Sequence, residues 1–535
     1  MVDDKPENPQ PRGWSWRDRA RGSVPWGRTL DPVVDPVEGI DAFPTAYVPD
    51  RLLVTRHPEA ESSDLVVLRK AAAAFGWELV PESLRGDELR GMDPDPGRLH
   101  PGLPGVFRAR LVAPDESGRG ESPVPPDAWR VLQRARSLAG GKLPGAGLEH
   151  VISIDPVGLN PFTKTNPFTK TNPFTKTNPF TKTNPAGGAV GAEQYALPGM
   201  GGRQPIAWVG PAPVRTPDAR VKGRRVVVAV LDTGCGTHEW LPDDVVTRSI
   251  TLDGRPVGLD DDADPERYPD LFGALDGEID VVAGHGTFIA GIVRQSAPDA
   301  DILSIRAANG MGLVDESFLL ATIADVAELL RRHRHGEDGG HPVDVLNLSL
   351  GYYHETPVDG QYSEVLGDLL QAIRELGCVV VCSAGNDAVD RPAFPASLWA
   401  WEGADNGIRP DKALPLISVG ALNPSGRTTA LFSNVGPWVR TFAVGAAVVS
   451  TSPAFNGGDQ ATTRDDRYGR RRETIDPDDY RGGFAAWSGT SFAAPLVAGR
   501  IAHRLGPGVP DDAAPDAAAT AVAEVLDEAD AATES

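Results

Sequence analysis

The first candidate for chemistry is Ser491, which lies in the run Trp-Ser-Gly-Thr-Ser-Phe-Ala-Ala-Pro at positions 487–495. A serine hydroxyl is a weak nucleophile unless a neighbouring base removes its proton, so a reactive serine needs a fixed position and a partner. Gly489 allows a tight turn before the serine, and Pro495 is tolerated only near the start of a helix. The pattern predicts that Ser491 lies at a helix N-terminus, where its own N–H and the helix dipole would face an oxyanion.

A carboxylate and an imidazole that could activate this serine lie upstream. Asp232 ends the valine-rich run at 225–232. Such a run is typical of a buried parallel strand, and open α/β sheets carry their sites at the carboxyl ends of their strands. His285 lies in the segment Gly-His-Gly-Thr-Phe-Ile-Ala-Gly at 284–291, whose small residues predict a closely packed helix. An acid, a base and a serine hydroxyl together could perform nucleophilic acyl transfer.

The order Asp232, His285, Ser491, with about 50 and about 200 residues between them, resembles that of the subtilisin-like (subtilase, S8) serine proteases. The motifs that carry the resemblance are Asp-Thr-Gly, His-Gly-Thr and Gly-Thr-Ser-Phe-Ala-Ala-Pro. The resemblance implies a three-layer α/β/α fold with a mostly parallel central sheet. It also implies that Ser491 attacks a peptide carbonyl, that His285 shuttles the proton, and that Asp232 orients and stabilises the imidazolium.

The same resemblance implies an oxyanion hole and a substrate-binding strand. Asn386 follows the apolar run at 378–382 and matches the asparagine whose side-chain amide, with the Ser491 N–H, binds the oxyanion in this family. A buried asparagine that merely caps a loop is the alternative. The implied substrate-binding positions follow two predicted strands, and they are Ser349, Leu350 and Gly351, whose backbone would pair with an extended peptide, and Ser383, Ala384 and Gly385.

Composition limits the class of protein. A chain of 535 residues, 40% of them apolar, predicts two or three compact units. With 52 basic and 74 acidic residues the net charge is −22, which argues against nucleic acid as a partner. Cys378 and Cys382, four residues apart on one predicted strand, would lie about 13 Å from each other and could not form a disulfide. No signal-peptide core or run of about 18 apolar residues is present, so we expect a cytoplasmic protein with no membrane partner, and unconventional release stays open.

The chain before these motifs predicts a separate N-terminal module at residues 46–158. A leader at 1–45, rich in Pro, Arg and Trp, is expected to be disordered or packed on later domains. The elements predicted in the module follow the order βαββαβ, with strands at 52–54, 77–80, 106–112 and 150–154, a helix at 64–75 and a second helix capped by Asp127. This order is a ferredoxin-like α+β layout. It resembles the N-terminal prodomain that many subtilases carry, which aids folding and inhibits the site.

A repeat separates the module from the catalytic motifs. The unit Asn-Pro-Phe-Thr-Lys-Thr occurs four times between residues 160 and 183. Proline at every sixth position cannot continue a helix or a central strand, so residues 159–203 are predicted to form an extended linker. Asn-Pro-Phe is also a short ligand motif in eukaryotic trafficking, an alternative that the bacterial character of the composition disfavours.

The peptidase domain is predicted at residues 204–505 and is followed by an acidic tail at 506–535. The domain alternates predicted strands at 302–306 and 416–419 with helices at 315–334 and 363–375, which is typical of a parallel sheet covered on both faces. Three insertions, at 259–280, 398–412 and 456–483, should lie on surface loops and shape the cleft.

We therefore interpret the chain as a bacterial serine endopeptidase that acts on protein or peptide substrates and could process itself. Two other hypotheses remain: a catalytically silent scaffold on the same fold, and an esterase that uses the same triad. The triad requires no cofactor. Structural calcium stays open, because family members often bind it, whereas the acidic run at 260–264 lacks the features of an EF-hand loop. An activating partner protein also stays open.

Overall fold

The computed structural model describes the chain in segments separated by short gaps. The described residues are 10–12, 14–15, 17–19, 27–56, 63–87, 105–113, 124–143, 145–154, 192–272, 278–356, 364–402, 408, 410–458, 464–473, 479–510 and 515–534. The predicted repeat tract and most of the predicted linker lie outside them.

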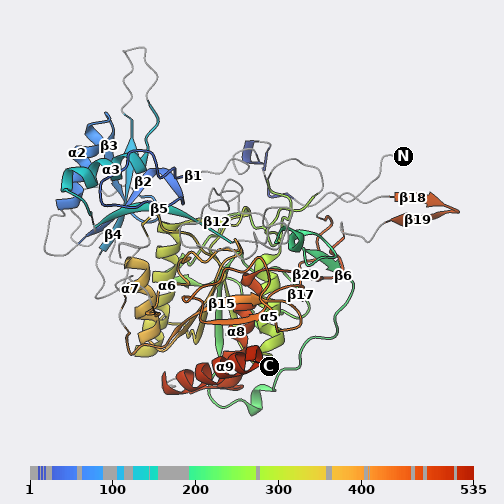
Figure 1. The fold of residues 1–535 in the computed structure, drawn as a ribbon. Coiled ribbons are helices and arrows are strands. Elements are labelled where there is room, and N and C mark those ends of the chain that lie inside the picture. Colours follow the sequence, from blue (N-terminus) through green and yellow to red (C-terminus); the bar gives the residue numbers. More distant parts are fainter. Residues whose placement is uncertain are drawn as a thin grey trace.

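A parallel sheet carries the candidate catalytic segments (Figure 1). Its seven strands have the order β16-β15-β14-β13-β7-β11-β8, and every neighbouring pair is parallel. Their bounds are β7 Val227–Asp232, β8 Val246–Thr247, β11 Asp301–Arg306, β13 Val345–Leu348, β14 Val379–Ser383, β15 Leu416–Leu422 and β16 Thr441–Val444. Strands covered on both faces need apolar residues throughout, which explains the unbroken apolar runs in the sequence.

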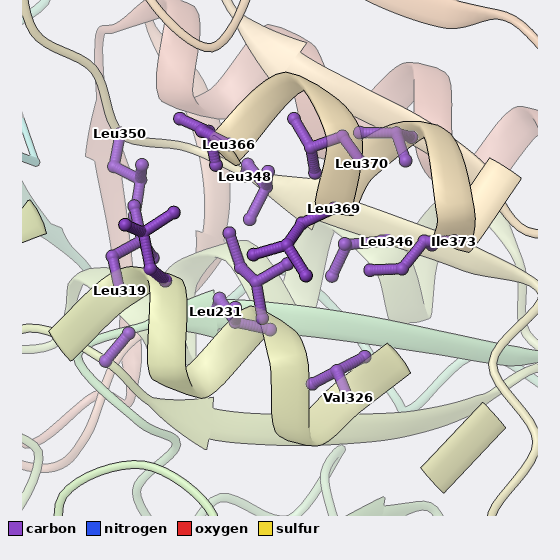
Figure 2. Packing of buried hydrophobic residues seen from close by; sticks show 14 of the residues in the cluster. Leu231, Leu319, Val326, Leu346, Leu348, Leu350, Leu366, Leu369, Leu370 and Ile373 are labelled. Atoms are coloured by element: carbon purple, nitrogen blue, oxygen red, sulfur yellow. The ribbon is translucent and has the colours of Figure 1, made fainter. Parts of the chain in front are cut away.

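Alternating side chains of β7 divide the core into two layers. Ala229 and Leu231 join the layer of α6 and α7, whereas Val228 and Val230 join the layer of α5, α8 and α9. The helices are α5 His285–Ser296, α6 Glu316–His335, α7 Glu364–Glu375, α8 Thr490–Leu505 and α9 Pro515–Glu534. Figure 2 shows apolar side chains of α6 and α7 packed against those of β7 and β13. The predicted three-layer α/β/α fold is confirmed.

The N-terminal module has the predicted element order. Its elements are β2 Ala46–Arg56, α2 Ser63–Ala73, β3 Glu78–Glu82, β4 Gly105–Val112, α3 Ala128–Ala139 and β5 Ala146–Ser153, with β1 Arg28–Thr29 paired to β2. The antiparallel strands have the order β5-β2-β4-β3, and Asp127 caps α3 as predicted. Strand β2 is much longer than the predicted 52–54, and its register with β5 shifts between Tyr47 and Leu52, the stretch that contains Pro49 and two charged residues.

The module lies against the α6 and α7 face of the peptidase domain (Figure 1). One face of its sheet packs on its own helices, whereas Leu53, Val106 and Ile152 join the core layer of α6 and α7. In addition, the peptidase strand β12 (Leu313–Asp315) pairs antiparallel with β5. One sheet therefore runs across both domains.

Segments on both sides of the predicted peptidase domain pack against it. The predicted tail contains α9, whose Ala518, Ala521, Val522 and Val525 are buried in the core layer of α8, because small side chains allow close approach of the helices. The predicted tail is thus part of the packed domain. At the other boundary, part of the predicted linker is packed, since the Tyr195 ring lies 5.0 Å from that of Phe432.

The remaining elements are short. They are β6 Gln204–Ile206, β17 Val448–Thr451 and β20 Phe484–Trp487 in one sheet, the pairs β9 Thr251–Leu252 with β10 Arg255–Pro256 and β18 Arg464–Arg467 with β19 Arg470–Glu473, and the 3-10 turns Glu193–Ala196 and Asp218–Arg220. The described leader residues between 10 and 19 pack on the insertion at 259–280, where Arg19 pairs with Asp270 and the Trp14 indole donates to Leu271 O at 3.1 Å. Within the described segments, no helix combines the length and the apolar character needed to cross a bilayer.

Candidate active site

Asp232 and His285 form a buried acid–base pair. Asp232 is the last residue of β7 and His285 is the first residue of α5, so the edge of the sheet and the start of a helix bring them together. His285 Nδ1 lies 2.7 Å from Asp232 Oδ1, and both side chains are 0% exposed. The Thr233 N–H also donates to Asp232 Oδ1, at 2.8 Å. The carboxylate is therefore placed to hold the imidazole with Nδ1 protonated and Nε2 able to accept a proton.

Ser491 is the second residue of α8, as the sequence predicted for a helix N-terminus. Pro495 lies in the second turn of the helix and has no N–H to donate to the Ser491 carbonyl. That carbonyl instead accepts a hydrogen bond of 2.9 Å from Oγ of Ser349, the residue that follows β13. The proline thus lets the serine backbone bind to the predicted substrate-binding segment.

The Ser491 hydroxyl donates to the Ser349 carbonyl at 3.4 Å. Among the described residues, His285 Nε2 is buried without a hydrogen-bond partner. The ring of Phe492, the residue after Ser491, lies 5.1 Å from the imidazole ring, so the serine segment and the base are neighbours. The structure therefore brings the three predicted triad residues into one site with the hydroxyl directed to Ser349.

Asn386 is held by the residue before Ser491. Its Oδ1 accepts hydrogen bonds from the Thr490 N–H at 2.8 Å and from Thr490 Oγ1 at 2.9 Å. Because the carbonyl end of the amide is bound in this way, the orientation of the NH₂ end is fixed, and it lies close to Gly489 in the same motif as Ser491. Thr490 was not singled out from the sequence as a site residue, although it lies inside the motif that identified Ser491.

A second asparagine organises the loop at 383–385. Asn434 Nδ2 donates to Ala384 O at 2.9 Å, and its Oδ1 accepts from Asp387 N at 3.1 Å. Gly385 has φ +100° and would place a Cβ 2.5 Å from Asn434 Nδ2, so this position requires glycine. Ser383 ends β14 and is buried. The motif Phe-Ser-Asn-Val-Gly at 432–436 was a sequence signal for Asn434, but not for this role.

The predicted substrate-binding segment is paired with the end of the N-terminal module. Gly351 N donates to Ser153 O at 2.9 Å, and Ser153 N donates to Gly351 O at 3.1 Å. The end of β5 also pairs with β12 on its opposite side, and Ile154 N donates to Gly312 O at 2.8 Å. Leu350, between Ser349 and Gly351, is buried in the core. The end of β5 therefore occupies the edge at which an extended peptide was expected to bind.

Sequence reasoning missed Glu266, which is hydrogen-bonded to the segments that follow Asp232 and His285. Its carboxylate accepts hydrogen bonds from Thr233 and Thr287, each next to or near a triad residue. Glu266 belongs to the insertion at 259–280, and no motif distinguishes it from the other acidic residues there.

Known proteins share the catalytic half of this chain. The model of the subtilase family matches residues 223–523, more than half of the 535 residues. The intracellular serine protease of Paenibacillus polymyxa is 28% identical over 300 residues, which are 53% of this chain and 67% of that protein. Subtilisin-like protease 2 of Pseudogymnoascus destructans is 30% identical over 229 residues, 42% of this chain and 43% of that protein.

Among solved structures, fervidolysin from Fervidobacterium pennivorans, described as a keratinolytic enzyme related to subtilisin, aligns at 20% identity with a TM-score of 0.42. That alignment covers 93% of this chain and 57% of the other. The family match spans Asp232, His285 and Ser491, whereas the N-terminal module lies outside it. With the match over residues 223–523 and the acid–base pair at its centre, the chain belongs to the subtilase family of subtilisin-like serine proteases.

Proposed function

We propose that this chain is a serine endopeptidase of proteins or peptides, and that its N-terminal module keeps it latent by filling the substrate-binding edge. The observation that carries the proposal is the pairing of Ser153 with Gly351, two residues from the Ser349 carbonyl that contacts Ser491 Oγ. Strand addition of this kind is how an extended peptide binds to an exposed edge. The module would therefore compete directly with substrates.

The proposed reaction follows from the positions of the side chains. His285 Nε2 takes the proton of the Ser491 hydroxyl as the oxygen attacks the peptide carbonyl, and Asp232 stabilises the resulting imidazolium. The Asn386 amide and the Ser491 N–H bind the oxyanion. The imidazolium then gives its proton to the leaving amine, and water releases the acyl group by the reverse sequence of proton transfers. The silent scaffold is not favoured, because every group required for this reaction is present.

The first prediction is self-cleavage downstream of the module. Ser153 and Ile154 already lie at the substrate-binding edge, so a cut downstream of them would separate the module from the peptidase domain. We expect the wild-type chain to be cut between about Ile154 and Arg203, within the proline-rich stretch that the sequence predicts to be an extended linker. The Ser491→Ala chain should remain intact, because it lacks the nucleophile. Mass spectrometry of both purified chains measures the outcome.

The exposed Ser425→Ala substitution provides the control and should be cut like the wild type. An intact wild-type chain with full activity would contradict latency. An intact and inactive wild-type chain would contradict self-cleavage and would instead favour a tethered module that an activating partner displaces. Labelling of Ser491 by a fluorophosphonate separates both enzyme hypotheses from a scaffold, and casein cleavage separates a peptidase from an esterase.

A buried histidine links the module to the peptidase domain. His150 of β5 is 1% exposed, with Nδ1 2.6 Å from Glu316 Oε2 and Nε2 2.8 Å from Glu355 Oε2. Burial lowers the pKa of His150, but the carboxylates of Glu316 and Glu355 outweigh it and raise the pKa to about 10. A neutral imidazole has one N–H, so contacts with two carboxylates favour the imidazolium. His354 and Arg136 also face Glu355, and Glu149 binds Ser317 next to Glu316.

The second prediction is that this contact weakens as the pH rises. A histidine whose pKa is raised in the folded protein stabilises it fully below its ordinary value of about 6.5, and this contribution is lost as the pH approaches 10. We therefore expect the His150 contribution to the free energy of unfolding to fall by about 1.4 kcal/mol per pH unit between pH 7 and 9. Comparing Ser491→Ala with Ser491→Ala/His150→Gln by thermal unfolding isolates it, because other titrating groups cancel. A stability difference that is constant from pH 7 to 9 would contradict the prediction.

The Paenibacillus relative is named an intracellular protease, which supports the proposal that this chain also acts inside the cell. The net charge of −22 supports a protein or peptide substrate rather than nucleic acid. Three statements remain predictions from the sequence. They are that no membrane partner is involved, that the reaction needs no cofactor, and that structural calcium can bind.

A further inference from the structure

The carboxylate of Glu266 connects the two chain segments that carry Asp232 and His285. Its Oε1 accepts from Thr233 Oγ1 at 2.5 Å and from the Gly286 N–H at 3.1 Å. Its Oε2 accepts from Thr287 Oγ1 at 2.5 Å and from the Thr287 N–H at 3.3 Å. Thr233 follows the triad acid, and Gly286 and Thr287 follow the triad base. The side chain of Glu266, which is 3% exposed, therefore binds both chain segments.

Thr233 extends this connection to the acid itself. Its hydroxyl lies 3.1 Å from Asp232 Oδ1 and accepts from the Gly286 N–H at 2.8 Å. Displacement of Glu266 would therefore release the hydroxyl that bridges the end of β7 and the start of α5. An error of a few tenths of an ångström in the Asp232–His285 contact is costly, because proton transfer requires close alignment.

The location of the carboxylate also has an electrostatic consequence. Helix α5 begins at His285, and the residue before it, Gly284, has no side chain that could cap the helix. Glu266 takes this place by accepting from two N–H groups of the first turn. The N-terminus of a helix is electropositive and disfavours an imidazolium there, whereas a carboxylate at the same position offsets that field.

We propose that Glu266 is a positioning residue of the triad, which holds the Asp232 and His285 segments in register and whose negative charge stabilises the imidazolium formed when His285 accepts the Ser491 proton. This inference rests on the proposed peptidase activity and adds a role for the insertion at 259–280, which was expected to shape the cleft. Other acidic residues of the insertion have local partners, since Asp261 pairs with Arg306 and Asp264 accepts from the Glu266 N–H.

The charge of Glu266 should depend on pH in the working range. Burial raises the pKa of Glu266 to about 8, against the opposing effect of the hydrogen bonds from Thr233 and Thr287. The other titratable groups that face it are Asp264 on its own loop, Asp232 at the end of β7, Cys235 after that strand, and His285 on α5. As the pH rises through 8, the carboxyl loses its proton, and its stabilisation of the imidazolium should appear above this pH.

The test compares Glu266→Gln with the wild type between pH 6.5 and 9.5, using a chromogenic peptide substrate after the module has been released. We expect kcat of the wild type to show a rise centred near pH 8 that the glutamine variant lacks. The ratio of the two kcat values should grow from about twofold at low pH to about tenfold above pH 9, with KM unchanged. Asp262→Asn, an exposed acid-to-amide change in the same insertion, is the matched control and should behave as the wild type.

A second variant guards against misfolding of the first. Glu266→Asp keeps the charge but is one methylene too short to reach all four donors, so it should lower kcat while keeping the rise near pH 8. A loss of kcat that is equal at every pH, or no loss, would overturn the inference, as would absence of the rise in the aspartate variant. If the wild type and Asp262→Asn cleave no peptide, the proposed function fails instead, and the two failures are thus distinguishable.

Discussion

Replacing Asp232 with asparagine should lower kcat about 10⁴-fold with little change in KM. The carboxylate oxygen that lies 2.7 Å from His285 Nδ1 is an acceptor and fixes the proton on that nitrogen. The Thr233 N–H donates to this same oxygen, so an asparagine with its carbonyl there keeps both contacts but is neutral. It therefore no longer stabilises the imidazolium that forms when His285 accepts the proton of Ser491. Steady-state kinetics on a chromogenic peptide measures the loss.

The control for this substitution is Asp260→Asn, which makes the same chemical change at an exposed position of the insertion. It should leave kcat within about twofold of the wild type, because surface substitutions away from the site have small effects. An Asp232→Asn chain with normal folding and a loss below about tenfold would show that the acid is not part of the reaction.

Replacing Asn386 with leucine should lower kcat by roughly 10²- to 10³-fold, again with nearly constant KM. The Asn386 side chain is bound through its carbonyl to Thr490, so its amide is fixed before the reaction begins. A pre-oriented donor stabilises the oxyanion only when negative charge develops, which affects kcat and not ground-state binding. Kinetics on the same substrate, with single-turnover measurement of acylation, give the effect on the chemical step.

The matched variant Asn386→Asp separates the donor from the packing. It keeps the shape and the acceptor that Thr490 binds, but it replaces the NH₂ group with an oxygen that would repel the oxyanion. Its loss should equal or exceed that of the leucine variant. If aspartate is tolerated with less than a threefold loss, the amide has no role in the reaction.

The sequence by itself determined the parallel sheet and the segments that carry Asp232, His285 and Ser491. Strands buried on both faces require apolar residues throughout, and helix starts require glycine and small residues, so both leave local signals. The βαββαβ order of the module could be predicted from the sequence for the same reason. Strand β2 was underestimated, because its register shift depends on pairing with β5, a partner about 100 residues away.

Tertiary structure alone decided which distant groups meet. Ser153 binds Gly351 and His150 binds Glu316 and Glu355 only because the module docks on α6 and α7, and no local pattern encodes such a contact. Helix α9 was read as a tail for the same reason, since its alanines become core residues only against α8. Glu266 is one of many acidic residues in the sequence. Its role arises from four hydrogen bonds to segments that the fold brings to it, because burial and donor geometry are properties of three-dimensional packing rather than of residue type.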